Sequence, residues 1–341
     1  MSDAMEVRKL QLTGGSSIAI TLPKKWVEGS GLKAGDAVGC VQRQDGSLLV
    51  TPRPNRKRSP QSLDLELGKE SAEHLFRRLV GAYLNGYDII QVRAKASLTP
   101  EQRSTARKAV KRAIGLEVVD EGTHSVTIQD FLDPTEFPLE KGLRRMASIA
   151  QLMHSDAINE LSGPARAPGD PSMEDRDSEV DRLYWLINKQ YHGLLRDARL
   201  AERMGMTPNQ ALNFLLVARL VERTADHAKR ISDNVVELEG ARLDPALVGK
   251  VRKLSEESLS VFKDAISAFF RKDIEVANDA IERARPIHEA KRALVHEAMD
   301  LKGPRAVALA YILESIERTA SYGADVGEVS INHAIAAAAG E

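Results

Sequence analysis

The sequence predicts a multidomain chain in which an N-terminal β-domain and a small α+β domain precede a long all-α region. Three observations support this fold class. The 341 residues exceed the length of one typical domain. Strand and turn signals fill the first 133 residues and disappear from about residue 139 onward. A stretch with prolines at positions 52, 54 and 60 separates the first β segment from the rest.

The domain boundaries follow these changes in pattern. We expect a β-domain at residues 1–52, a linker at 53–61, an α+β domain at 62–133, and helical bundles at 134–240 and 241–341. The whole chain is nearly balanced, with 48 basic and 49 acidic residues, but residues 1–60 hold ten Lys and Arg against five Asp and Glu. A basic head domain on an acidic body indicates that only the head meets a polyanion.

Composition and missing motifs exclude several classes of protein. Cys40 is the single cysteine, so neither an internal disulfide nor a cysteine-based zinc site is expected. The N-terminus lacks a signal-peptide pattern, and no stretch approaches the roughly 18 apolar residues of a membrane span. We therefore expect a cytoplasmic protein without membrane insertion. No nucleotide-binding glycine loop, zinc-protease motif or nucleophile elbow is present, so we do not expect an enzyme.

The first domain is predicted to consist of short strands joined by tight turns. Its expected elements are two strands on either side of the turn at 13–16, a helical turn at 23–27, and a hairpin of residues 37–42 and 47–50. Asp45-Gly46 joins the two strands of this hairpin, which is the strongest hairpin signal in the chain.

The middle domain alternates strand and helix. Strands are expected at 63–67, 87–92, 117–119 and 125–128, and helices at 70–84 and 99–114. The order β-α-β-α-β-β predicts a small α+β sandwich, ferredoxin-like or a relative. The second helix carries a row of basic residues, for which we favour a solvated face over a second DNA contact: Arg103, Arg107, Lys108, Lys111 and Arg112.

Six helices are expected in the remaining chain. They span 139–161, 173–204, 208–239, 245–271, 274–301 and 304–337, with Gly and Pro between them. Pro286 lies inside the fifth helix and should kink or divide it. The segment VERTADH at 221–227 recurs as IERTASY at 316–322, each about midway along the third helix of its triplet. Two tandem three-helix bundles follow from this repeat.

Residues 5–52 resemble the AbrB/MazE/SpoVT swapped-hairpin domain. The resemblance is carried by four blocks, which read RKLQLTGGSS (8–17), LPKKW (22–26), GLKAGD (31–36) and DGSLLV (45–50). It implies a homodimer whose two chains exchange strands to build one β-barrel and present basic hairpins to DNA. Dimerisation agrees with size, because one copy of about 45 residues holds too small a core.

The resemblance also selects candidate DNA-binding residues in this domain. Lys and Arg neutralise phosphates and release counterions. We expect phosphate contacts from Arg8, Lys9, Lys24, Lys25 and Arg43, with Ser16 and Ser17 as donors in the turn. The alternative is a module that only dimerises, or one that binds a partner protein.

Residues from about 139 to 337 resemble PhoU, the tandem three-helix regulator of phosphate uptake. The Glu-Arg-x-x-Asp-His block and the duplication carry this resemblance. Together with the first domain, the chain resembles the archaeal AbrB–PhoU fusions. The PhoU resemblance implies that acidic motifs of the bundle hold iron or other metals.

Two acidic pairs in the first bundle are the candidate metal ligands. Asp177 and Asp181 are four residues apart, as are Glu222 and Asp226, so each pair shares a helix face. Facing pairs would offer hard oxygen ligands to Mg, Mn or Fe, with Zn a further candidate. Because 49 acidic residues give about seven such pairs by chance, the spacing by itself is weak.

Neighbouring residues leave further roles open. Arg182 and Arg223 adjoin motif acids and offer ordinary salt bridges instead, and His227 is either a ligand or a packing residue. In the second bundle Ser321 stands where the motif wants Asp, and Lys291 falls where the counterpart of Asp181 would sit. Any metal is therefore expected in the first bundle alone.

These features predict a non-catalytic, DNA-binding regulator of phosphate uptake. The main alternative is an adaptor that acts on a phosphate-transporter ATPase or a sensor protein, with the head used only for dimerisation. Two less favoured functions are a metal-dependent enzyme built on the first bundle's carboxylates and a nonspecific chromosomal architectural protein. The word phosphate enters through resemblance alone.

Overall fold

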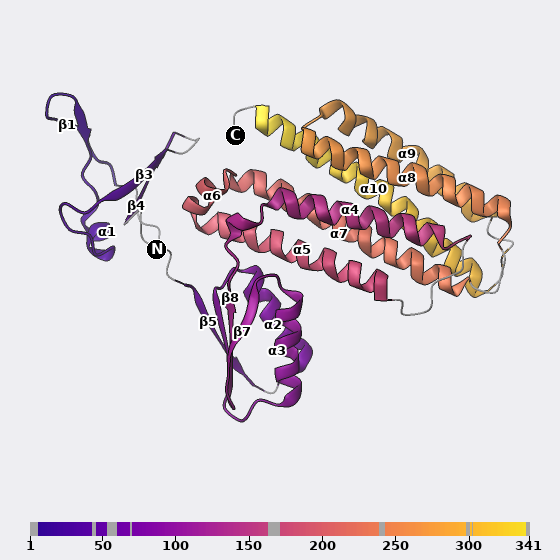
Figure 1. Cartoon of the computed structure of the whole chain (residues 1–341). Helices are drawn as coiled ribbons and strands as arrows, with labels where there is room; N and C mark the ends of the chain where they lie inside the picture. The colour runs from indigo at the N-terminus through magenta and orange to yellow at the C-terminus, as the bar shows by residue number, and fades with distance from the viewer. Residues whose placement is uncertain are drawn as a thin grey trace. The chain divides into compact units, whose positions relative to one another are not determined.

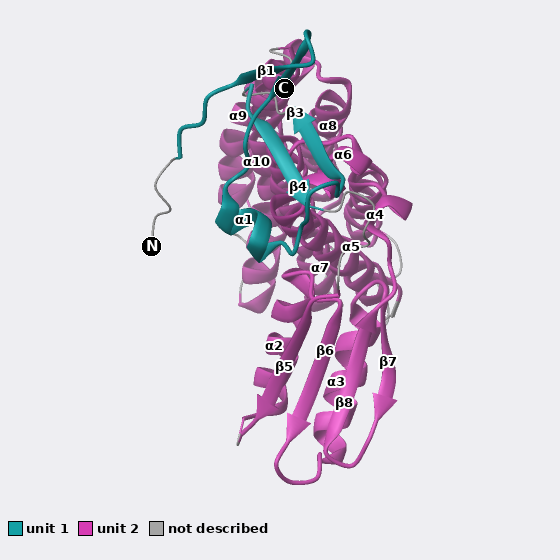
Figure 2. Ribbon diagram, turned by 90° about the vertical axis from the view of Figure 1, so that its left-hand side faces the viewer, with its two compact units in different colours: residues 1–59 teal, residues 60–341 magenta. Residues whose placement is uncertain are grey.

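The structure is a computed structural model that describes residues 6–42, 46–52, 60–68, 70–162, 171–238, 243–297, 301 and 303–338. The chain divides into two compact units, residues 1–59 and 60–341 (Figure 2). Arg43, Asp45 and residues 53–59 of the expected linker lie outside the described residues. Within the described part of the chain, no helix is long and apolar enough to cross a membrane.

Unit 1 consists of two antiparallel strand pairs and one short helix. Its elements are β1 (Gln11–Thr13), β2 (Ser17–Ala19), α1 (Lys24–Gly29), β3 (Val38–Gln42) and β4 (Leu48–Pro52). Gly14 and Gly15 in the β1–β2 turn have φ angles of 63° and 85°, a region open to glycine at no steric cost. The two predicted hairpins are confirmed, and no closed barrel forms among the described residues of one chain.

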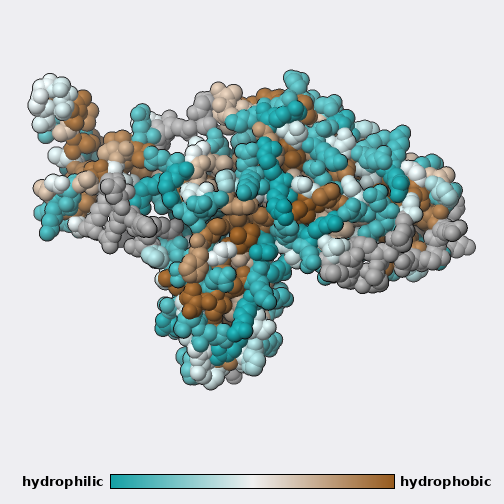
Figure 3. Space-filling model, in the orientation of Figure 1, coloured by the Kyte–Doolittle hydropathy of each residue, from teal (hydrophilic) through white to brown (hydrophobic). Residues whose placement is uncertain are grey.

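Unit 1 has almost no core of its own. Leu32 is its one buried residue within the described segments 6–42 and 46–52. Leu12 and Ile18, which are paired across β1 and β2, remain 73% and 68% exposed. Figure 3 shows the corresponding brown apolar surface along these strands. A single chain therefore leaves the apolar faces of its strands in water.

The middle domain belongs to unit 2 and is a two-layer α+β sandwich, as predicted. Its elements are β5 (Ser62–Leu67), α2 (Ala72–Leu84), β6 (Ile89–Ala94), α3 (Pro100–Arg112), β7 (Leu116–Glu121) and β8 (Ser125–Asp130). The sheet order is β5-β6-β8-β7, with β5 and β6 parallel and the remaining pairs antiparallel. Helices α2 and α3 cover one face of the sheet (Figures 1 and 2). The element order β-α-β-α-β-β differs from the β-α-β-β-α-β order of the ferredoxin-like arrangement, and the parallel strands β5 and β6 are direct neighbours in the sheet.

Helices fill the rest of unit 2. After a 3-10 turn, η1 (Pro134–Glu136), come α4 (Leu139–Asn159), α5 (Pro171–Arg196), α6 (Ala198–Met204), α7 (Pro208–Glu237), α8 (Pro245–Arg271), α9 (Ile274–Glu297) and α10 (Pro304–Ala338). The expected helix at 173–204 divides, because Asp197 leaves the helical conformation and caps α6 by accepting from the Arg199 amide. The fifth expected helix, α9, continues through Pro286 and is not divided.

The two three-helix bundles share one continuous apolar core. The first contains α4, α5 and α7 and the second α8, α9 and α10, and α7 also packs against α10 (Figure 1). A buried polar contact crosses between the bundles. His154 Nε2 lies 2.8 Å from Ser255 Oγ, and His154 Nδ1 lies 3.2 Å from Thr319 Oγ1. This contact fixes α4 of the first bundle relative to α8 and α10 of the second.

Helix α5 presents one face to the bundle and another to the middle domain. Its apolar residues Val180, Leu183 and Ile187 enter the bundle core at helical spacing. On its opposite face, Trp185 lies 6.3 Å from the Phe76 ring of α2, measured between centroids. Lys189 forms an ion pair with Asp130 of β8, and both side chains are buried. These contacts dock the middle domain onto the first bundle.

Replacing Lys189 tests this docking. In Lys189→Met the Asp130 carboxylate remains buried without its cation, and we expect a loss of about 3–5 kcal/mol in the free energy of unfolding. Lys250→Met is the matched control, since Lys250 pairs with Glu297 on the exposed surface at 2.7 Å and should cost less than about 1 kcal/mol. Urea unfolding measures both variants. Equal, small losses in the two would show that the buried pair does not anchor the domain.

Candidate functional site

The four predicted acids lie on two adjacent helices of the first bundle. Asp177 and Asp181 are on α5, and Glu222 and Asp226 are on α7, which packs directly against α5. The side chains of Asp177, Asp181 and Glu222 are 19%, 24% and 13% exposed, so their carboxylates are largely withdrawn from water. Asp226 lies on the more exposed side of α7.

The pKa values of these acids show that they influence one another. Burial, and then the charge of Asp177, raises the pKa of Asp181 to about 6. Burial, and then the charge of Asp226, raises the pKa of Glu222 to about 7, with Asp181 adding to the effect. The pKa of Asp226 is also raised, by the partial burial of its carboxyl group within an otherwise exposed residue and then by the charge of Asp177. Because the influences cross between α5 and α7, the predicted pairs form one acidic group.

Three cations partly neutralise this acidic group. Arg112 Nη2 lies 2.5 Å from Asp181 Oδ2, Lys229 Nζ lies 3.3 Å from Asp177 Oδ2, and Arg219 Nη1 lies 2.9 Å from Glu222 Oε1.

The salt-bridge alternative is therefore right in kind, but its cations differ from those expected. None of these three ion pairs uses Arg182 or Arg223, the sequence neighbours of the acids. Arg112 comes from the middle domain, and nothing in the sequence indicated that it would pair with an acid of the bundle. The basic face of α3 is also not merely solvated, because Arg103 and Arg107 both pair with Glu121 of β7.

A metal ion fits the chemistry of the acidic group, although the side chains do not yet converge. Across the described residues, no three or more His, Cys, Asp or Glu side chains are placed to hold a metal. However, Glu222 Oε2 is buried and has no hydrogen-bond partner. An unpaired buried carboxylate oxygen is unfavourable, and hard oxygen donors suit Mg or Mn. The donors would have to move together for a metal to bind.

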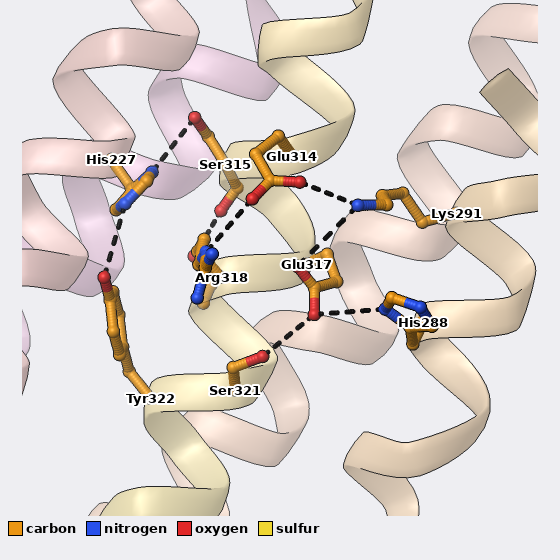
Figure 4. A network of polar contacts seen from close by, with 10 residues as sticks. His227, His288, Lys291, Glu314, Ser315, Glu317, Arg318, Ser321 and Tyr322 are labelled. Carbon is orange, nitrogen blue, oxygen red and sulfur yellow. Dashed lines mark hydrogen bonds and ion pairs between the residues drawn. The ribbon is translucent and has the colours of Figure 1, made fainter.

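The equivalent position of the second bundle carries its own cation. Lys291 Nζ lies 2.7 Å from Glu314 Oε2 and 4.0 Å from Glu317 Oε2 (Figure 4). Ser321, the counterpart of Asp226, donates to Glu317 Oε1 at 3.0 Å. The hydrogen bond from Lys291 lowers the pKa of Glu314. Lys291 thus lies next to the acids of the second bundle, as the alignment of the two repeats predicted, and its ammonium group neutralises them.

His227 joins the two bundles instead of facing the acids. Its Nδ1 lies 3.1 Å from Ser315 Oγ and its Nε2 lies 3.4 Å from the Tyr322 hydroxyl, both on α10 (Figure 4). Burial, and then the charge of Arg230, lowers the pKa of His227 to about 4, so the ring is neutral at pH 7. Since both ring nitrogens are engaged, His227 is a packing residue, one of the two roles that its sequence position left open.

The predicted DNA-binding residues of unit 1 are exposed wherever they are described. Arg8 and Lys9 precede β1, Ser16 ends the β1–β2 turn and Ser17 begins β2, and Lys24 and Lys25 begin α1. Lys24 pairs loosely with Glu28 at 3.7 Å, and its side chain is 87% exposed. Arg43 lies outside the described residues. The described members are free to meet a large polyanion without first leaving a buried position.

Comparison with known proteins finds relatives for both units. The model of the MazE antitoxin family, described as antidote-toxin recognition, matches residues 11–58. The model of the PhoU domain matches residues 143–235 and 251–330, one range in each bundle. No curated protein matches at a significant level.

Two solved structures resemble the chain. The crystal structure of PhoU from Pseudomonas aeruginosa matches with a TM-score of 0.49 and 17% identity, covering 58% of this chain and 96% of its own. The phosphate transport system regulatory protein PhoU from Streptococcus pneumoniae matches with a TM-score of 0.41 and 20% identity, covering 57% and 94%. The two ranges matched by the PhoU model together span just over half of the chain, and the chain therefore belongs to the PhoU family.

Proposed function

We propose that the chain is a DNA-binding regulator of phosphate uptake. The PhoU-family bundle responds to the state of the cell, and the basic head domain, unit 1, carries that response to DNA. The observation that supports this most directly is the union in one chain of a PhoU-family bundle and a MazE-type domain. The function is regulatory and requires no catalytic step.

Charge and exposure support DNA as the partner of the head domain. Residues 1–60 hold twice as many basic as acidic residues, and the remainder of the chain is acidic. Lys24 and Lys25 are exposed next to each other at the start of α1, and Arg8 and Lys9 are exposed before β1. Basic side chains that project into water neutralise phosphates and release counterions. The acidic body would repel the same polyanion.

The exposed strands support a second copy of the head as its structural partner. Val7, Leu10, Leu12, Ile18 and Ile20 are each more than half exposed in one chain. Covering them in a homodimer would supply the core that one copy lacks. A dimer would also double the basic charge offered to DNA. We propose that the head domains of two chains pair through β1 and β2.

The acidic group of the first bundle supports a bound metal, the remaining part of the proposal. Asp177, Asp181, Glu222 and Asp226 would hold it, with Mg, Mn, Fe or Zn as candidates. When bound, the metal would supply positive charge that relieves the repulsion among these carboxylates. The unpaired Glu222 Oε2 would gain a partner.

The adaptor function remains as a second candidate. Val307 and Tyr311, one turn apart on α10, are 54% and 50% exposed. Such a pair on the outside of the bundle suits contact with another protein, for example a transporter ATPase or a sensor protein. In this case the head would serve dimerisation alone.

DNA binding is tested by reversing two charges in the head. We expect Lys24→Glu/Lys25→Glu to weaken binding at least about tenfold and to reduce the dependence of affinity on salt, because phosphate contacts are lost. Fluorescence anisotropy with DNA from upstream of the chain's own gene and of phosphate-transport genes measures both quantities.

Lys250→Glu/Lys253→Glu is the control, because it makes the same charge change on exposed positions of α8. Selective binding that only the head variant loses supports a transcription regulator. Equal binding to scrambled DNA indicates an architectural protein instead. Wild-type protein that binds no DNA at low salt would rule out the DNA function and favour the adaptor.

Head dimerisation is tested through the chain's single cysteine. Cys40 is exposed on β3, so a spin label there reports the distance between the heads of two full-length chains. We expect a defined distance in the wild type and its loss in Leu12→Glu, where a buried charge would disrupt the pairing. Leu152→Glu, on an exposed site of α4, should keep the distance. A wild type without any intermolecular distance would contradict the head dimer.

The acidic group predicts an unusual dependence of stability on pH. Folding raises the pKa of Asp181 to about 6 and of Glu222 to about 7, so both bind protons more tightly folded than unfolded. Their contribution to stability is present at pH 4 and is lost as the pH rises through 6 to 7. Glu222→Gln should therefore raise the melting temperature of metal-free protein by a few degrees at pH 8, with little effect at pH 5.

The same variant tests the metal. Added Mn²⁺ should stabilise the wild type at pH 8 more than at pH 5, where protons compete for the carboxylates, and should stabilise Glu222→Gln less. Glu317→Gln changes the equivalent position of the second bundle, where Lys291 is already the cation, and should keep the wild-type response. Identical Mn²⁺ responses in Glu222→Gln and Glu317→Gln would place the metal elsewhere.

A further inference from the structure

Arg112 connects the middle domain to the acidic group. It is the last residue of α3, yet it binds Asp181 of α5, 69 positions away in the sequence, with Nη2 2.5 Å from Oδ2. Its guanidinium carbon lies 5.4 Å from the centroid of the Trp185 ring, one turn along α5. The same side chain therefore covers an indole and neutralises a candidate metal ligand.

Other polar contacts between the middle domain and α5 lie further along α5, away from Asp181. Lys189 pairs with Asp130, and Arg196 donates to Asn85 Oδ1 at 3.2 Å. The C-terminal end of α3 is thus the part of this interface in direct contact with the acidic group. A response at Arg112 would be local and would not require the whole domain to leave.

Arg112 differs from the other cations of the two acidic groups because it comes from another domain, whereas Lys229 and Arg219 come from α7 of the first bundle itself. In the second bundle Lys291 comes from α9 of the same bundle and forms ion pairs with Glu314 and Glu317. In the first bundle the cation at Asp181 comes from another domain. Moving Lys291 away from its acids would require a change within the second bundle, whereas Arg112 belongs to α3, outside the first bundle.

We infer that Arg112 is a displaceable cation which occupies Asp181 when no metal is bound, and that a divalent metal at the acidic group releases it. The inference rests on the metal part of the proposed function. A guanidinium and a metal ion would compete for the same carboxylate, because both need its lone pairs and its negative charge. Release frees the end of α3 from α5, so the middle domain registers whether the first bundle holds metal.

The test uses full-length protein in which Trp26→Phe leaves Trp185 as the only tryptophan. Calorimetric titration with Mn²⁺ at pH 8 gives the affinity. The emission wavelength of Trp185 reports whether the Arg112 side chain still shields its ring from water. We expect Arg112→Met to bind Mn²⁺ at least about fivefold more tightly, because the competing cation is gone. Its Trp185 emission should already be shifted to the red, and Mn²⁺ should shift it no further.

Two further variants control for charge and for folding. Arg107→Met lies on the same helix and pairs with Glu121 inside the middle domain, so it should behave as the wild type in both readouts. Arg112→Lys keeps the positive charge with a smaller perturbation, and its Mn²⁺ affinity should stay within about twofold of the wild type. Circular dichroism confirms that each variant is folded.

Each result decides between the inference and the proposal beneath it. The inference is supported if Arg112→Met binds Mn²⁺ more tightly than the wild type. It also requires that Mn²⁺ shift the Trp185 emission to the red in the wild type and in the two controls, but not in Arg112→Met. Wild type and Arg112→Met that bind Mn²⁺ equally, or a weaker Arg112→Met, would overturn the competition while leaving the metal site intact. Mn²⁺ binding to none of the variants would overturn the metal site and the inference together.

Discussion

The structure of unit 2 depends on a single helix, α5, that must satisfy two partners at once. One face of α5 carries the apolar residues that complete the first bundle, and the opposite face docks the middle domain through Trp185 and Lys189. Burying the Lys189–Asp130 pair is costly unless both charges remain together, so the docking geometry is specific. Asp177 and Asp181 lie on the same helix, which is why the acidic group and the middle domain share a boundary.

Repulsion among buried acids then determines how the two bundles differ. The raised pKa values of Asp181 and Glu222 show that Arg112, Lys229 and Arg219 do not fully compensate burial and like charges in the first bundle. In the second bundle, Lys291 and Ser321 stand at two of the positions that are acidic in the first, and the hydrogen bond from Lys291 lowers the pKa of the neighbouring Glu314. The repeated sequence thus gives an acidic group with uncompensated charge in the first bundle. In the second bundle the equivalent group is already neutralised by a lysine.

Local signals were enough to predict most of the fold, whereas the partners of the acids could not be predicted. Pro, Gly and capping residues give helix bounds within a few residues, and the four-residue spacing of acids gives their shared faces. The sequence did not predict the break at Asp197, because an Asp inside a helical pattern is common. Its role as the cap of α6 becomes visible only in the folded backbone. Arg112 was missed as a partner of Asp181 because their contact depends on how two domains dock, which periodicity within either segment does not encode. The head's strands were predictable, but one chain alone leaves them without a core.

The neutralised second bundle still has a physical role, which is to fix the first. His154 bridges Ser255 and Thr319, and His227 bridges α7 to Ser315 and Tyr322, so buried polar groups of both bundles satisfy one another. The pKa values of both histidines are lowered to about 4, so these contacts keep the same charge state throughout the neutral range. A fully paired polar contact inside an apolar core favours one packing over competing ones. Helix α7 is therefore held against α10 by apolar packing and by paired polar groups, while its acidic residues Glu222 and Asp226 take part in the acidic group shared with α5.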